Sequence, residues 1–125
     1  MDSNRRNIEI LKKIVEYCDQ IDATKARYGN SLETLENDQD YTNSTAMSIL
    51  QIGELTTRLT TGFKKKYNGI PWQDIKAMRN IAAHHYGQFR LHYLWSTMND
   101  DIAPLRAYCN QCIEELGKLT SDNTA

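Results

Sequence analysis

The chain has 125 residues, of which 25% are charged and 40% are hydrophobic, and its formal net charge is −1. This length and composition indicate one globular domain with a moderate core, and the near-zero charge argues against a protein that coats nucleic acid through bulk charge. No apolar run approaches the roughly 20 residues of a membrane span, and the N-terminus lacks the apolar core of a signal peptide. We therefore expect a cytoplasmic protein.

The N-terminal segment predicts one long amphipathic helix over residues 4–29. Its apolar side chains recur at steps of three and four, which places them on one stripe. They are Ile8, Leu11, Ile14, Val15, Cys18 and Ile21. Gly29 is expected to end this helix. Residues 31–41 are polar and acidic, and Ser31 is expected to cap a short helical turn there.

A second long helix is expected at about residues 42–60, where the helical spacing of apolar residues returns. Gly53 lies in its middle and costs about 1 kcal/mol relative to alanine, so we interpret it as a point of close approach by another helix. Its neighbour Glu54 either pairs with Arg79 across the bundle or has no such partner. The pattern alone leaves both interpretations open.

A third helix is expected to begin near Pro71, because the missing N–H of proline does no harm in a first helical turn. Its apolar spacing continues to about Tyr86, and Gly87 is the expected terminator. The last unit, residues 91–119, has the same spacing. Pro104 is expected to break or kink it.

No segment alternates polar and apolar residues as a strand would. The expected fold is all-α, an antiparallel bundle of four to five helices in a single domain at 1–119, with a frayed tail at 120–125. Cys18, Cys109 and Cys112 form no zinc-ligand pattern, so we expect reduced thiols that fill the core. We expect no metal and no cofactor.

The stretch from 78 to 87, MRNIAAHHYG, carries the side chains with the most chemistry. On one helix, Asn80 and His84 share a face, whereas Arg79 and His84 lie roughly 140° apart. Arg79 and His84 converge if the helix ends or distorts, if the arginine folds back, or if a second subunit completes the site. An arginine that binds phosphate and a histidine that moves protons suit RNA cleavage without a metal, but such residues more often form a polar seam.

The segment IPWQDIKAMRNIAAHHY resembles the HepT-like toxins of the HEPN superfamily, as do QIGEL at 51–55 and DDIAPL at 100–105. The motif of that family is an arginine, a polar residue, three spacers, a histidine, any residue and a tyrosine. Those places are filled here by Arg79, Asn80, His84 and Tyr86. The resemblance extends over about residues 5–116. His85 stands where the family commonly has aspartate.

The resemblance implies a HEPN-like homodimer whose two Arg–His motifs face a shared cleft. It also implies a metal-independent endoribonuclease, the toxin of a type VII-like toxin–antitoxin system, with tRNA or mRNA as substrate. Arg79 would bind phosphate, His84 would act as acid and base, and Asn80 would support them. A nucleotidyltransferase antitoxin similar to MntA would form a hetero-oligomer with the toxin and transfer AMP to Tyr86, which would fill the phosphate site.

Two further features and one alternative function stay open. The lysines Lys64, Lys65 and Lys66 either steer an RNA backbone or form a solvated helix end whose charge suits the helix dipole. Trp72 either stacks on a base or anchors the packing of its helix. The alternative function is a non-catalytic helical dimer that binds a nucleotidyltransferase partner or a nucleotide, and the histidine in place of aspartate favours it.

Overall fold

The computed structural model describes residues 3–83 and 87–124, with side chains described for 3–80 and 90–120. In these ranges the chain forms helices joined by short connections and has no strand, which confirms the expected all-α bundle. The elements are α1 (Ser3–Tyr28), α2 (Leu32–Asn37), α3 (Gln39–Thr56), α4 (Thr61–Lys66), α5 (Trp72–Ala83), α6 (Gly87–Ser96), the π-helical stretch η1 (Thr97–Asp101) and α7 (Ile102–Thr124).

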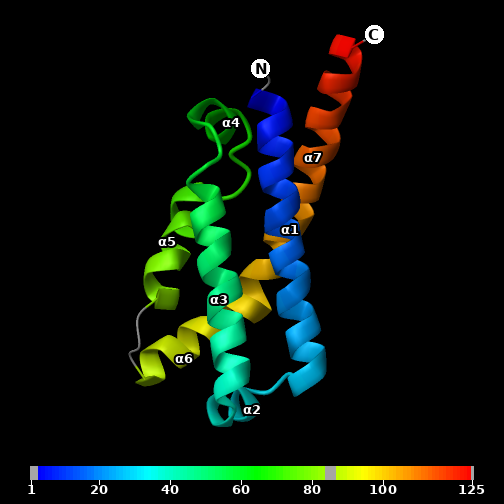
Figure 1. The fold of residues 1–125 in the computed structure, drawn as a ribbon. Coiled ribbons are helices and arrows are strands. Elements are labelled where there is room, and N and C mark those ends of the chain that lie inside the picture. Colours follow the sequence, from blue (N-terminus) through cyan, green and yellow to red (C-terminus); the bar gives the residue numbers. More distant parts are fainter. Residues whose placement is uncertain (1–2, 84–86, 125) are drawn as a thin grey trace.

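Three long helices, α1, α3 and α7, form the body of the bundle (Figure 1). Helix α1 packs against both α3 and α7, and it runs antiparallel to both. Helix α5 packs on the other side of α3, and α6 lies crosswise beyond the end of α5. Both chain ends lie at the same end of the bundle as α4, whereas α2 lies at the opposite end. The long, near-parallel contacts bury the apolar stripes read from the sequence.

Local signals define the ends of the first three helices. Helix α1 ends just before Gly29, whose φ of 111° is a conformation that glycine adopts without strain. Ser31 caps α2 by accepting a hydrogen bond of 3.0 Å from the Thr34 amide, so both expectations for this corner are confirmed. Helix α3 begins earlier than expected, because Asp38 caps it by accepting from the amides of Asp40 and Tyr41 at 3.0 and 3.2 Å.

The expected terminator of the third helix is wrong. Gly87 is the first residue of α6 and therefore begins a helix. Glycine is enriched after helices but is also accepted at their starts, so residue type alone does not separate the two. The residues at 84–86, where we expected the third helix to end, lie outside the described ranges. At its start, α5 begins one residue after Pro71, whose carbonyl accepts from the Asp74 and Ile75 amides at 2.9 and 3.1 Å.

The last unit is interrupted, as expected, but the interruption lies just before Pro104. The chain passes through η1 between α6 and α7, and the direction of the helix changes there (Figure 1). Pro104 then falls in the first turn of α7, where its missing N–H is not needed. Helix α7 continues to Thr124, into the segment that we expected to be frayed.

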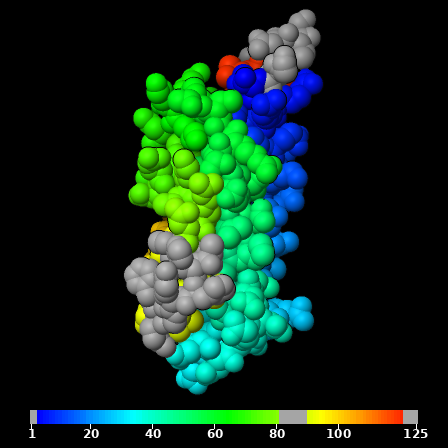
Figure 2. All heavy atoms as spheres, turned by 60° about the vertical axis from the view of Figure 1, so that its left-hand side comes forward, coloured from blue at the N-terminus to red at the C-terminus, as the bar shows by residue number. Residues whose placement is uncertain are grey.

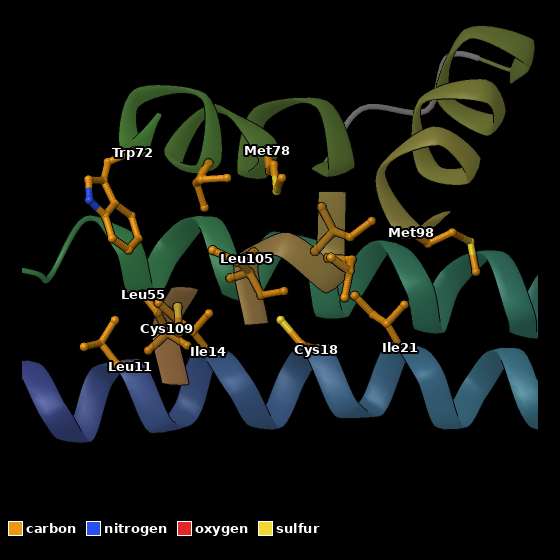
Figure 3. Packing of buried hydrophobic residues seen from close by; sticks show 14 of the residues in the cluster. Leu11, Ile14, Cys18, Ile21, Leu55, Trp72, Met78, Met98, Leu105 and Cys109 are labelled. Carbon is orange, nitrogen blue, oxygen red and sulfur yellow. The ribbon is translucent and has the colours of Figure 1, made fainter. Parts of the chain in front are cut away.

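The core lies where α1, α3, α5 and α7 face one another (Figure 3). The three cysteines are free thiols and fully buried, which confirms their expected place in the core. Trp72 is 6% exposed, donates from Nε1 to the Tyr67 carbonyl at 2.6 Å, and packs on Phe63 with ring centroids 5.7 Å apart. Its indole is therefore a packing anchor rather than a surface for stacking bases. Of the helices in the described ranges, none is long and apolar enough to cross a membrane.

Candidate functional site

Helices α3 and α5 approach closely at Gly53. A Cβ placed on Gly53 would lie 2.7 Å from the backbone nitrogen of Arg79, 2.8 Å from its Cβ, and 3.1 Å from the carbonyl oxygen of Lys76. Two of these three atoms are backbone, so they cannot move without moving α5. The close approach expected from the sequence is confirmed, and it brings the residue after Gly53 next to Arg79.

Glu54 and Arg79 form an ion pair across this contact. Nη1 of Arg79 donates to Oε1 of Glu54 at 3.1 Å, and the side chains are 36% and 44% exposed, respectively. Of the two interpretations left open by the sequence, the ion pair is the one observed. The guanidinium is thus held from one side by a carboxylate and stays accessible at the surface of the bundle. An accessible arginine can bind an anion from solution.

Arg79 borders an open surface hollow along α5, which is lined by Gln73, Asp74, Lys76, Ala77, Arg79 and Asn80. Asn80 is exposed beside it. Figure 2 shows that α5 and α4 lie next to α3 on one face of the molecule. His84 and Tyr86, which the sequence assigned to acid–base chemistry and AMP acceptance, lie outside the described residues, as does His85. Arg79 and Asn80 are therefore the motif residues whose surroundings the structure shows.

The three consecutive lysines occupy different surroundings. Lys64 donates from Nζ to the carbonyl of Thr56 at 3.3 Å, which places its charge at the C-terminal end of α3. Lys65 is exposed, and Lys66 lies over the ring of Tyr67, 5.6 Å from its centroid. Burial lowers the pKa of Lys64, and repulsion from Lys76 lowers it further. Sequence reasoning missed Lys76, although its position three residues before Arg79 puts both on one side of a helix.

A separate apolar hollow of about 410 Å³ lies between α5 and the junction of α6 with α7. Its lining includes Ile75, Met78 and Leu105, and its titratable side chains are Asp74, Tyr93 and Asp101. The two aspartates do not make it a metal centre, because no three His, Cys, Asp or Glu side chains cluster in the described part of the chain.

The chain is similar to one protein family and to several proteins whose names assign them provisionally as ribonucleases. The family described as Ribonuclease HepT-like matches residues 6–112. A protein of Caldanaerobacter subterraneus, named provisionally as an RNase, is 26% identical over 106 residues, covering 84% of this chain and 92% of its own length. A Methanocaldococcus jannaschii protein, named as a gamma-glutamylcyclotransferase and provisionally as an RNase, is 36% identical over 67 residues, covering 54% of this chain.

The extent of these matches differs. The chain spans 30% of the length of the Methanocaldococcus relative. A Thermococcus cleftensis protein named "Probable ribonuclease HepT" is 33% identical over 55 residues, covering 44% of this chain and 50% of its own length. No solved structure gives a significant match. Because the family match covers most of the helical bundle, the chain belongs to the HepT-like ribonuclease family of the HEPN superfamily.

Proposed function

We propose that this protein is a metal-independent endoribonuclease and the toxin of a type VII-like toxin–antitoxin system. The observation that carries the proposal is the Arg79 guanidinium, which Glu54 holds at 3.1 Å while both side chains stay partly exposed. It occupies the arginine position of the family motif, next to the exposed Asn80. A cation that is oriented and accessible suits the binding of an RNA phosphate.

The proposed reaction needs no group beyond the RNA and the protein. The imidazole of His84 removes the proton from a ribose 2′-hydroxyl, and that oxygen attacks the adjacent phosphorus. The bond from phosphorus to the 5′-oxygen breaks, and an imidazolium returns a proton to the leaving oxygen, which yields a 2′,3′-cyclic phosphate and a 5′-hydroxyl. Arg79 stabilises the charge on the phosphate, and Asn80 contributes a hydrogen bond.

Two copies of the chain would form the working site. The acid and the base of this reaction are needed on opposite sides of the phosphate. A homodimer with a shared cleft would supply one His84 imidazole for each role. It would also bring each Arg79 guanidinium within reach of the His84 of the second copy.

The proposed antitoxin is a nucleotidyltransferase that transfers AMP to the hydroxyl of Tyr86. Tyr86 is seven residues after Arg79, and the added phosphate would carry a negative charge towards the guanidinium. An AMP group held there would occupy the place of the RNA phosphate and repel the RNA backbone. The proposed partners are therefore RNA, a second copy of this chain and the nucleotidyltransferase.

Cleavage of end-labelled single-stranded RNA in EDTA tests the catalytic proposal. The protein should cut the RNA and leave 2′,3′-cyclic phosphate ends, whereas the Arg79→Ala and His84→Ala variants should lose at least about 100-fold in rate. Glu114→Gln, an exposed change on α7, is the matched control and should cut normally. Undiminished cleavage by either variant would refute the assigned roles. Intact mass spectrometry after co-expression with the nucleotidyltransferase tests whether Tyr86 accepts AMP. The parent protein should gain the mass of AMP, and the Tyr86→Phe variant should not.

The histidine at position 85, where the family commonly has aspartate, favours the alternative of a non-catalytic helical dimer. The Glu54–Arg79 ion pair links α3 to α5, which is a structural role that needs no RNA. Under this alternative the protein would bind a nucleotidyltransferase or a nucleotide and leave RNA intact. The protein and its His84→Ala variant would then elute together with the nucleotidyltransferase, while neither cut RNA in the assay above.

A further inference from the structure

An open hollow between α4 and α5 is lined by positive charge. Its lining residues are Thr61, Lys64, Lys65, Asn68, Ile70, Pro71, Trp72, Gln73 and Lys76. The charged members of this set are three lysines, and no carboxylate lines the hollow. Two of the lysines come from α4 and the third comes from α5, so the fold gathers charges that the sequence keeps apart. A surface of this kind suits a phosphate group.

The hollow shares part of its lining with the hollow that contains Arg79. Gln73 and Lys76 line both of them. Lys76 is one helical turn before Arg79 on α5, which is a rise of about 4.5 Å along the helix axis. Cationic side chains therefore occur from α4 along α5 to Arg79, whose guanidinium is paired with Glu54, and Asp74 is the carboxylate in the lining of the second hollow.

The surroundings of Lys64 show that its charge and that of Lys76 influence each other. Burial is the larger cause of the lowered pKa of Lys64, and repulsion from Lys76 is the second. A phosphate bound between the two ammonium groups would offset this repulsion. The charge of Lys66 is directed elsewhere, because it lies over Tyr67 and lines a different hollow beside α1 and α7.

We propose that Lys64, Lys65 and Lys76 form a binding site for the RNA backbone that extends the site of Arg79 towards α4. This inference rests on the proposed function, because it takes RNA as the ligand. It adds Lys76 to the residues read from the sequence and removes Lys66. Trp72, the aromatic residue in its lining, is buried and paired with a carbonyl, so the lining offers no exposed aromatic ring on which a base could stack.

Binding of a 2′-O-methylated single-stranded RNA tests this proposal without depending on catalysis, because the attacking hydroxyl is blocked. The test variant is Lys64→Gln, Lys65→Gln and Lys76→Gln combined. The control variant combines Lys66→Gln with changes of two exposed lysines on α1, Lys12→Gln and Lys13→Gln, so both variants lose the same net charge. Fluorescence anisotropy over a series of salt concentrations gives the affinity and its salt dependence.

The slope of log affinity against log salt is negative, and in the test variant its magnitude should fall by about 2, while the affinity at low salt should fall more than tenfold. The control variant should have nearly the same slope and the same affinity at low salt as the parent protein. Equal losses in both variants would mean that bulk charge alone is sensed, and they would overturn the proposal, as would an unchanged slope in the test variant. A Lys65→Gln/Lys76→Gln double variant keeps the Lys64–Thr56 hydrogen bond, and the magnitude of its slope should fall by about 1.4.

The two proposals can fail separately. If the protein cuts RNA but the test variant binds the probe like the parent, the lysine site is refuted and the ribonuclease proposal stands. If the protein leaves RNA intact but its binding of the probe depends on these three lysines, the catalytic proposal is refuted and the lysine site stands.

Discussion

The backbone nitrogen of Arg79 lies 2.7 Å from the position that a Cβ on Gly53 would occupy. The absence of that one carbon therefore sets the distance between α3 and α5. It also sets the place of Arg79, to which we assign the binding of an RNA phosphate. The stability of the bundle and the position of the proposed phosphate-binding group depend on the same contact.

Gly53→Ala should destabilise the protein by about 1–3 kcal/mol, because the new methyl group overlaps backbone atoms of α5. It should also slow RNA cleavage, since the helix that carries Arg79 has to move. Urea unfolding measures the first effect, and the cleavage assay in EDTA measures the second.

Gly117→Ala on α7 is the matched control for this change. No atom lies within 4 Å of the Cβ that it would add, so the usual helical preference for alanine should stabilise the protein by up to about 1 kcal/mol. Because the two substitutions should change the free energy of unfolding in opposite directions, the comparison separates the effect of steric overlap from that of helix propensity. A Gly53→Ala protein as stable as the parent would contradict the close approach of the two helices.

Glu54→Gln should change the free energy of unfolding by less than about 1 kcal/mol, because the ion pair with Arg79 is partly exposed to solvent. The rate of RNA cleavage should fall about tenfold or more, since the guanidinium loses the group that orients it. Glu54 is in this respect a positioning residue.

Measuring kcat and KM for this variant shows which step is affected. The control is Glu114→Gln, which removes a 3.8 Å pair with Lys118 whose two side chains are each 73% exposed. That variant should alter neither unfolding nor cleavage. Unchanged cleavage by Glu54→Gln would exclude a positioning role and leave the pair as a link between helices.

Asn7→Ala should destabilise the protein by about 1–3 kcal/mol, because Asn7 is 1% exposed and makes two hydrogen bonds to Thr60. Its Nδ2 donates to the hydroxyl of Thr60 at 3.1 Å, and its Oδ1 accepts from the Thr60 amide at 3.2 Å. Thr60 also caps α4. Thermal unfolding measures the effect, and Asn43→Ala at an exposed position of α3 should stay within about 0.5 kcal/mol of the parent.

The cysteines should react slowly with a disulfide reagent at pH 8 until the protein is unfolded. Burial raises the pKa of Cys18 to about 12 and that of Cys112 to about 11, so little reactive thiolate exists in the folded protein. Because these pKa values are raised, their contribution to stability is full below the ordinary thiol value near 9. It is lost as the pH rises towards 11–12.

Counting thiols with and without urea at pH 8 checks this expectation, and urea unfolding at pH 8 and pH 10 checks its sign. The protein should be less stable at pH 10. Rapid reaction of all three cysteines in the folded protein would show that the core around Cys18 and Cys112 opens readily.

Short-range signals in the sequence predicted much of the fold. The apolar stripe of α1, its end at Gly29 and the Ser31 cap of α2 each depend on residues within one or two helical turns. The motif that contains Arg79 is also local, and it led to the family that the comparisons confirm. Gly87 marks where this kind of reasoning failed, because a glycine beside a helix does not show on which side the helix lies.

Local sequence patterns were enough to predict the amphipathic helices and the family of the chain, because both depend on spacings of a few residues. The packing of the helices determines which distant residues meet. It joined Glu54 to Arg79 across 25 positions and Asn7 to Thr60 across 53, and it brought Lys76 beside Lys64. Helical periodicity specifies the direction in which a side chain points from the axis of its helix. Only the packing of the helices specifies which residue of another helix lies opposite that side chain.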